Sequence, residues 1–235
     1  MKIALIVPME VEAQFYLQRF PAERIKKYGV TSYRLFHLGQ NEIFLGLSGI
    51  GKGQAAMNLA SLLACEDIDL VIMTGSAGSL AEDVKLKDLI LADGFSYYDV
   101  HCQAAGNYKV GQIPHEPASF PTNNEYAAAF ADFLTEKGVA FKKGLIVTGD
   151  SFLASPVQKE AIENDFPTAL AAEMEGAALA QVAYHFDKPL IGLRAVSDNG
   201  DADANMNFDQ FVEEVGAKAA KLIVEFLQTE KMNKQ

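Results

Sequence analysis

Three carboxylates stand at the boundaries of predicted secondary-structure elements, where an α/β protein places most of its chemistry. Glu12 follows the first apolar run, Glu175 precedes a helix of small residues, and Asp198 follows the apolar run 189–196. Arg194 lies within that last run, and a buried arginine requires a carboxylate partner because an unpaired buried charge is costly. Each carboxylate alone also has a structural explanation, since acidic side chains stabilise the first turn of a helix. Their combination with an inward arginine favours a reaction centre.

Two small-residue segments follow predicted strands and allow a ligand to approach the backbone closely. Residues 46–53 nearly match a phosphate-binding P-loop, but Gly53 stands where a hydroxyl would hold magnesium. This segment is therefore interpreted as a glycine turn, with Lys52 solvated at the helix start, or as a turn that brings Ile50 to a ligand. In Thr74-Gly75-Ser76-Ala77-Gly78, the Ser76 hydroxyl and Gly78 are candidate ligand contacts. One glutamate of Glu173-Met174-Glu175 is expected to face the site and the other to be solvated.

Several function classes are disfavoured by composition. The net charge of −11 argues against general binding to nucleic acid or to an anionic membrane. The four histidines have no zinc-ligand spacing, and no Gly-x-Ser-x-Gly elbow is present, so neither a metal site nor a serine hydrolase is expected. No cofactor is expected either. Two distant cysteines and no apolar run of membrane-spanning length predict a reduced, cytoplasmic protein.

The elements that must position these side chains alternate between strand-like and helical patterns. Strands are predicted at 3–7, 32–38, 42–48, 69–74, 89–92, 94–98, 143–148 and 189–196, and helices at 11–20, 52–65, 123–137, 156–164, 176–186 and 208–228. Continuous apolar strands with intervening helices predict a three-layer α/β/α fold with a largely parallel sheet, which the hairpin at 32–48 makes mixed. No linker divides residues 1–235, so we predict one domain with a frayed tail at 228–235. The irregular segment 99–121 is long enough to serve a site or an interface.

The sequence resembles the 5′-methylthioadenosine/S-adenosylhomocysteine nucleosidases of the nucleoside phosphorylase/hydrolase superfamily. The resemblance extends from Met1 to Phe211 and rests on six segments that occur in the family's order. These segments are Met9-Glu10-Val11-Glu12, Ser48-Gly49-Ile50-Gly51-Lys52, Thr74-Gly75-Ser76-Ala77-Gly78, Gly149-Asp150-Ser151-Phe152, Ala172-Glu173-Met174-Glu175 and Arg194-Ala195-Val196-Ser197-Asp198.

The resemblance implies that the chain hydrolyses the N-glycosidic bond of an adenine nucleoside, as a homodimer. Asp198, oriented by Ser197, would protonate N7 of the adenine; Glu12 would activate water; and Glu175 would hold the ribose hydroxyls. The remaining implied contacts are Met174 on the sugar, Arg194 and Ser76 among the polar groups, Phe152 and Leu153 on the adenine, and Met9, Ile50 and Phe208 around the 5′ substituent.

The segment 97–108 departs from the family pattern. It is one residue longer, and Ala105 and Asn107 replace a phenylalanine and a tyrosine that reach the partner's 5′ pocket in the family. The preferred 5′ group is therefore left open between methylthio, homocysteinyl, deoxy and other adenosine-like substituents. A purine nucleoside phosphorylase is the nearest alternative, although Glu12 would repel phosphate. A nucleoside-binding protein without activity is a further alternative, against which the presence of all three carboxylates argues.

Overall fold

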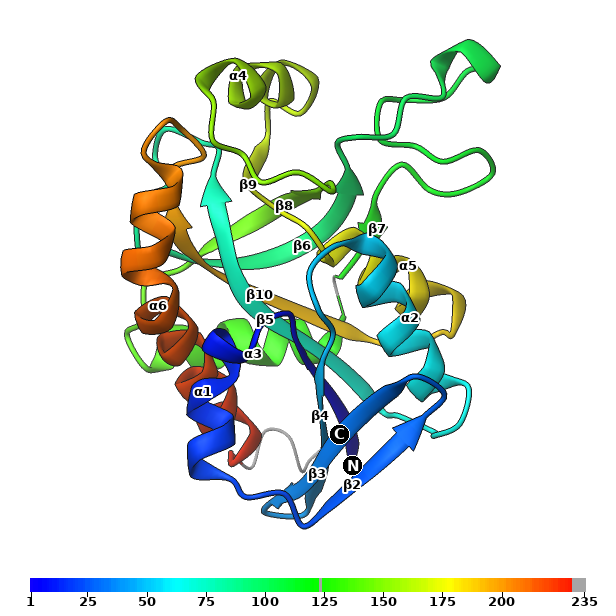
Figure 1. Cartoon of the computed structure of the whole chain (residues 1–235), viewed down its shortest axis with the longest axis vertical. Coiled ribbons are helices and arrows are strands. Elements are labelled where there is room, and N and C mark those ends of the chain that lie inside the picture. Colours follow the sequence, from blue (N-terminus) through cyan, green and yellow to red (C-terminus); the bar gives the residue numbers. More distant parts are fainter. Residues whose placement is uncertain (123, 230–235) are drawn as a thin grey trace.

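The computed structural model of the chain describes residues 1–122 and 124–229. Across these residues a mixed sheet of ten strands runs through the molecule, and helices cover both of its faces (Figure 1). This arrangement confirms the predicted α/β fold with a mixed central sheet. No helix in the described ranges is both long and apolar enough to cross a membrane.

The strands are β1 (Lys2–Val7), β2 (Arg24–Tyr28), β3 (Thr31–Leu38), β4 (Asn41–Leu47), β5 (Leu70–Ser79), β6 (Leu89–Tyr97), β7 (Phe120–Pro121), β8 (Lys142–Thr148), β9 (Ala169–Glu173) and β10 (Leu190–Asp198). The helices are α1 (Glu10–Arg19), α2 (Lys52–Leu63), α3 (Glu125–Glu136), α4 (Pro156–Asp165), α5 (Gly176–His185) and α6 (Ala204–Leu227), with a short 3₁₀ turn at Gln103–Ala105.

The sheet closes on itself at one end. Its order is β10-β6-β8-β9-β5-β1-β4-β3-β2, and β10 also pairs with β5, so that five strands form a ring. β5 and β10 run parallel and are buried almost throughout. This agrees with their continuous apolar sequences, which are typical of strands covered on both faces. The ring is completed where Gly78 and Ser79 of β5 pair with Ala172 and Ala171 of β9. The carboxyl ends of β5, β9 and β10 thereby meet.

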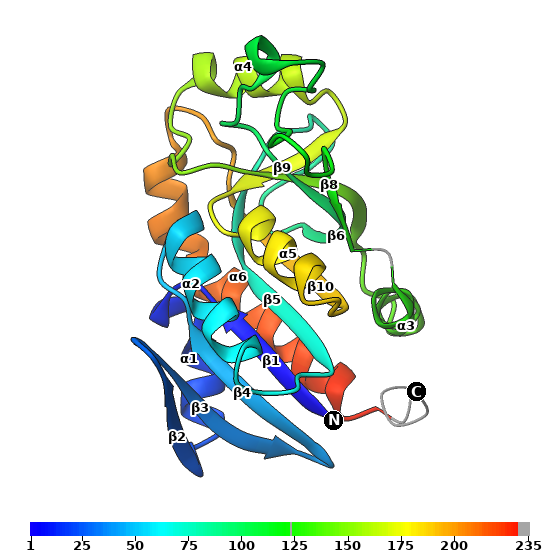
Figure 2. The ribbon, with the colours of Figure 1, turned by 90° about the vertical axis from the view of Figure 1, so that its right-hand side faces the viewer.

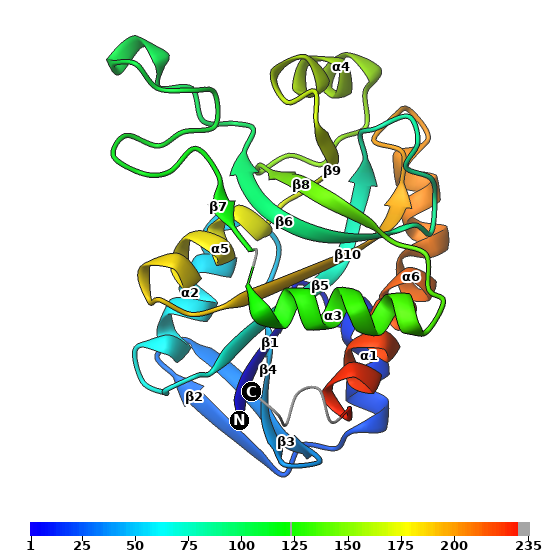
Figure 3. The same ribbon diagram turned by 180° about the vertical axis from the view of Figure 1, so that it is seen from behind.

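Two hydrophobic layers hold the helices against the sheet. The side chains of α1, α3 and α6 pack with one face, and those of α2 and α5 pack with the other (Figures 1 and 2). Seen from behind, α3 lies in front of the sheet, where it contacts β10 and α6 (Figure 3). A smaller cluster lies beneath α4, around Ile162 and Leu153. α1 and α6 pack tightly at Gly216, where a Cβ atom would lie 3.0 Å from the Cα atom of Glu12.

The structure corrects several predicted boundaries. The small-residue segment 75–79, expected to follow a strand that ends at 74, continues β5, and 89–97 form one strand, interrupted by a register shift between Ala92 and Gly94. The strands β2, β7 and β9 were not predicted, because β2 is largely charged and exposed and β9 is rich in alanine. The predicted helix start at residue 123 and the predicted tail beyond 229 lie outside the described residues.

Between β6 and β7 the chain projects from the body of the molecule, at the upper right of Figure 1. Most of its side chains from His101 to Lys109 are exposed. Within the described chain, no residue of this projecting segment lines the pocket described below.

Candidate active site

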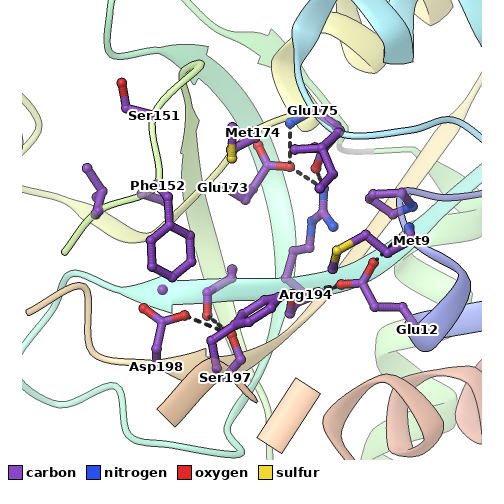
Figure 4. A pocket seen from close by; sticks show the side chains of 18 residues that line it. Met9, Glu12, Ser151, Phe152, Glu173, Met174, Glu175, Arg194, Ser197 and Asp198 are labelled. Atoms are coloured by element: carbon purple, nitrogen blue, oxygen red, sulfur yellow. Dashed lines mark hydrogen bonds and ion pairs between the residues drawn. The ribbon is translucent and has the colours of Figure 1, made fainter. Parts of the chain in front are cut away.

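A pocket opens where the carboxyl ends of β1, β5, β9 and β10 meet the loop that follows β8 (Figure 4). Every residue predicted above for catalysis or binding lines this pocket: Met9, Glu12, Ile50, Ser76, Gly78, Phe152, Leu153, Met174, Glu175, Arg194, Ser197, Asp198 and Phe208. The carboxylates fall into two groups. Asp198 lies near Phe152 at one end, while Glu12 and Glu175 lie near Arg194 at the other.

Glu12 is held in the first turn of α1 by three hydrogen bonds. It accepts from the Ser76 amide at 2.6 Å, the Ser76 hydroxyl at 2.7 Å and the Met9 amide at 3.2 Å. Its side chain is buried, and burial raises its pKa, against the opposing effects of the Arg194 charge and of these hydrogen bonds. Gly75 is required here, because a Cβ atom at this position would collide with the Arg194 guanidinium and lie 3.0 Å from a Glu12 oxygen.

Arg194 is buried on β10 and forms ion pairs with Glu173 and Glu175. The predicted carboxylate partner is therefore confirmed, but the expectation that one of these glutamates is solvated is wrong. Both are buried, because residues two apart in extended backbone share a face and the chain then turns into α5. Glu173 also accepts hydrogen bonds from the Thr148 hydroxyl and from the Gly176 amide at 2.8 Å, so its carboxylate binds the first amide of α5.

Three buried carboxyl groups, those of Glu12, Glu173 and Glu175, thus lie around one guanidinium, which pairs with two of them. Burial is the largest effect and raises the pKa of Glu175 to about 7; the charge of Arg194 opposes this rise, and those of Glu173 and Glu12 add to it. The surrounding carboxylates in turn outweigh burial and raise the pKa of Arg194, which keeps its charge. This end of the pocket therefore holds three carboxyl groups and one guanidinium in a buried setting, where water screens charge little.

Asp198 has different surroundings. It accepts hydrogen bonds from the Ser197 hydroxyl at 2.8 Å and the Gly200 amide at 2.9 Å, and it forms no ion pair with any described residue. Burial raises its pKa, which favours the protonated form. Gly78 lets this carboxylate approach β5, because a Cβ atom there would lie 2.8 Å from an Asp198 oxygen. This end of the pocket is suited to giving up a proton.

The apolar wall of the pocket is partly open to solvent. Phe152 and Phe208 contact each other edge to face, with ring centroids 5.6 Å apart. Phe152 is 40% exposed and Ile50 is 51% exposed, whereas the other end of the pocket is buried. A planar ring and an apolar substituent therefore have contact surface at the mouth, next to the polar interior.

The amides at the start of α2 are occupied by the protein's own carboxylates. The Gly51 amide donates to Glu175 at 2.8 Å and the Lys52 amide donates to Asp150 at 2.8 Å. The Lys52 side chain forms ion pairs with Asp99 and Asp150, so the expectation that it is solvated is wrong. Helix-start amides and a nearby lysine are the groups that would bind phosphate, and here the Gly51 amide, the Lys52 amide and the Lys52 ammonium group already bind carboxylates.

Sequence reasoning missed two contributions to the site. The burial of both glutamates was not expected, although a second acidic residue near a buried arginine is itself a signal of pairing. The link between Lys52, Asp99 and Asp150 joins three segments that are distant in the sequence, and no local pattern indicates it. In the described part of the chain, no group of three His, Cys, Asp or Glu side chains is arranged to hold a metal ion.

Comparison with known proteins agrees with this geometry. A sequence model of the phosphorylase superfamily matches residues 2–228. The 5′-methylthioadenosine/S-adenosylhomocysteine nucleosidase of Staphylococcus carnosus is 34% identical over 228 residues, which cover 97% of this chain and 99% of that protein. The chain belongs to this nucleosidase family within the phosphorylase superfamily.

Solved structures of the nucleosidase family have the same fold. The S-adenosylhomocysteine nucleosidase of Streptococcus pyogenes, in complex with 5-methylthiotubericidin, matches with a TM-score of 0.91 at 36% identity, over 97% of this chain and 96% of that one. The nucleosidase of S. pneumoniae, with the transition-state inhibitor MT-ImmA, also has a TM-score of 0.91 at 36% identity, over 97% and 99%. The resemblance stated from six sequence segments is thus confirmed.

Proposed function

We propose that this enzyme hydrolyses the N-glycosidic bond of 5′-substituted adenine nucleosides, of the 5′-methylthioadenosine and S-adenosylhomocysteine type, releasing adenine and a 5-substituted ribose. The observation that carries the proposal is the division of one pocket into two carboxylate ends, one without a cation and one built around Arg194. The ligands bound to the two streptococcal relatives support a nucleoside-like substrate.

In the proposed reaction, Asp198 donates its proton to N7 of adenine while the bond between C1′ and the base breaks. The bonding electron pair leaves with adenine, and Ser197 orients the acid. Phe152 and the Leu153 backbone hold the base in the orientation that presents N7 to Asp198. General acid catalysis of this kind contributes about 10²- to 10⁴-fold in rate.

The other end of the pocket stabilises the positive charge that develops on the ribose. A carboxylate about 4 Å from a unit positive charge is worth about 4 kcal/mol at an effective dielectric of 20. Since the charge grows as the bond breaks, this attraction favours the transition state over the substrate. Glu175 and Met174 hold the sugar, with Ser76 and Arg194 ordering the polar groups. Glu12 takes a proton from water as the water oxygen bonds to C1′.

Water is the proposed nucleophile because the pocket has no free cationic site for phosphate. Arg194 is already paired with two carboxylates, and the amides at the start of α2 bind Glu175 and Asp150. A buried Glu12 would further repel a phosphate ion.

We also propose that a second copy of the chain completes the mouth of the pocket. Met9, Ile50 and Phe208 would contact the 5′ substituent, and Ile50 is half exposed there. The residues 99–121 would reach the partner's site. Sedimentation equilibrium is expected to give twice the chain mass of 25.5 kDa at micromolar concentration, and a monomeric mass would contradict this. A cytoplasmic location is part of the proposal and is supported by two free cysteine thiols.

The decisive experiment measures release of the free base from 5′-methylthioadenosine, S-adenosylhomocysteine, 5′-deoxyadenosine and adenosine, with inosine, which would release hypoxanthine, as the control, each with and without inorganic phosphate. Hydrolysis predicts adenine release that does not depend on phosphate, together with a free reducing sugar. Strict dependence on phosphate, with a sugar phosphate as product, would show a phosphorylase instead. The rates within the panel identify the 5′ group.

A further inference from the structure

The loop that follows Asp198 determines how this carboxylate is held. Residues 199–203 connect β10 to α6, and the Gly200 amide in this loop donates to an Asp198 oxygen at 2.9 Å. Gly200 has a φ of +64°, a backbone conformation that glycine adopts easily and that other residues rarely adopt. A displacement of the loop would therefore remove one of the two hydrogen bonds that Asp198 accepts.

A lysine from a different element binds this loop. Lys159 lies on α4, and its ammonium group donates to the Asn199 carbonyl at 2.8 Å. Its side chain is only 21% exposed, and its nearest carboxylate is that of Glu163, one helical turn away at 3.9 Å. Its methylene groups pass over the loop, because a Cβ atom on Gly200 would lie 3.9 Å from the Lys159 Cδ atom. The ammonium group is thus directed at the loop backbone, with its stem packed on Gly200.

We propose that Lys159 is a positioning residue for Asp198: it fixes the loop whose amide binds the catalytic carboxylate. The connection runs from the Lys159 ammonium to the Asn199 carbonyl, and from the adjacent Gly200 amide to the carboxylate. The same connection links the segment of Phe152 to the segment of Asp198, the two residues proposed to act on the base, because α4 directly follows the loop that carries Phe152. This inference rests on the proposed function, since it concerns the acid of that reaction.

Electrostatics gives Lys159 a second effect on the same group. The groups that act on Asp198 are the Ser197 hydroxyl, the Gly200 amide, the Asp201 carboxylate and the Lys159 ammonium. Burial raises the pKa of Asp198 most and Asp201 adds to this, whereas Lys159 lowers the pKa. Removal of the ammonium group therefore has two separable consequences. The carboxylate loses its orientation, which slows proton donation, and its pKa rises, which extends the protonated form to higher pH.

The test compares the pH dependence of kcat/KM for adenine release in wild type, Lys159→Met, Lys159→Arg and Lys218→Met. Methionine keeps the packed stem without the charge, and arginine keeps the charge. Lys218 is the matched control, because its ammonium group also donates to a backbone carbonyl at 2.8 Å, that of Lys87, away from the pocket. The thermal unfolding midpoint of each variant shows that the protein is folded at assay temperature.

We expect Lys159→Met to lower the maximal kcat/KM by about tenfold, the effect of one lost charge-assisted hydrogen bond, and to move the alkaline limb to higher pH. Lys159→Arg should restore both, and Lys218→Met should match wild type. The inference would be overturned if the pH profile of kcat/KM were unchanged in Lys159→Met, or if kcat/KM fell while the alkaline limb stayed in place. It would also be overturned if Lys218→Met showed the same changes as Lys159→Met. If wild type itself releases no adenine, the proposed function fails, and the inference falls with it.

Discussion

The two ends of the pocket use the same kind of side chain in opposite electrostatic settings. At the sugar end, Glu12, Glu173 and Glu175 surround the buried Arg194, and two of them pair with it. At the base end, Asp198 is equally buried but has only a hydroxyl and an amide as partners. The difference teaches that a counter-ion decides the role of a buried carboxylate. At the sugar end the charge of Arg194 opposes the rise in pKa that burial causes for Glu12 and Glu175, whereas Asp198 has no paired cation and is suited to hold a proton.

Removal of the shared cation should have the largest effect on stability. We expect Arg194→Met to lower the free energy of unfolding by about 3–5 kcal/mol, because it leaves buried carboxylates unpaired. Asp198→Asn should change it by about 1 kcal/mol or less, since the amide retains hydrogen-bonding groups of the same shape. Urea denaturation at pH 7 measures both. Lys188→Met, which removes a surface ion pair with Asp67, is the control for loss of a cation. If Arg194→Met and Asp198→Asn lowered the free energy of unfolding equally, the proposed difference between the two ends of the pocket would be wrong.

The burial of Glu175 at the sugar end should also make stability depend on pH. The pKa of Glu175 is about 7 in the folded chain, against an ordinary value of 4.5. The unfolded chain therefore releases this proton first, and wild-type stability falls as pH rises from about 4.5 to about 7. Glutamine has no proton to release, so the thermal midpoint of Glu175→Gln, relative to wild type, should be higher at pH 8 than at pH 5.

Asp67→Asn is the control for this pH effect. The pKa of the exposed Asp67 is lowered by Lys188, so this residue is ionised in both states between pH 5 and 8. Its variant should show a constant difference from wild type across that range. A constant difference for Glu175→Gln as well would contradict the account of the sugar end.

A change behind the pocket should affect the sugar end alone and by a smaller amount. In Gly216→Ala the new Cβ atom would lie 3.0 Å from the Glu12 Cα atom, so α1 must shift by a few tenths of an ångström. We expect kcat/KM to fall by about tenfold or less, in line with the sensitivity of catalysis to small misplacements. Gly53→Ala is the matched helical control, since no atom lies within 4 Å of its new Cβ. Equal activity of the two variants would show that Glu12 tolerates the shift.

The sequence predicted the pocket better than it predicted the fold around it. Most predicted site residues lie at or near the end of a strand or at the start of a helix, and local order along the chain is enough to recognise such positions. The closure of five strands into a ring depends on the pairing of β5 with β9, and the alanine-rich sequence of β9 gives little sign of a strand. Pairing between distant segments is not encoded in local periodicity.

Glu173 and Lys159 show the same limit at the level of single residues. Glu173 ends β9, and its burial follows from the turn into α5 and from the position of Arg194 on another strand. Lys159 has the sequence context of a surface lysine on a short helix, and its contact with the Asn199 carbonyl spans forty residues. Both contacts arise when elements far apart in the sequence come together, so neither could be predicted from the residues nearby.

The most direct test of the account compares two leaving groups. Adenine must be protonated to leave, whereas 4-nitrophenolate leaves without a proton. With 5′-methylthioadenosine, Asp198→Asn and Glu12→Gln should each lower kcat/KM by about 10²- to 10⁴-fold. With the 4-nitrophenyl 5-methylthioriboside, Glu12→Gln should remain as impaired, whereas Asp198→Asn should recover to within about tenfold of wild type, because only the acid becomes unnecessary. Equal impairment of Asp198→Asn on both substrates would contradict the assignment of the proton to the base end.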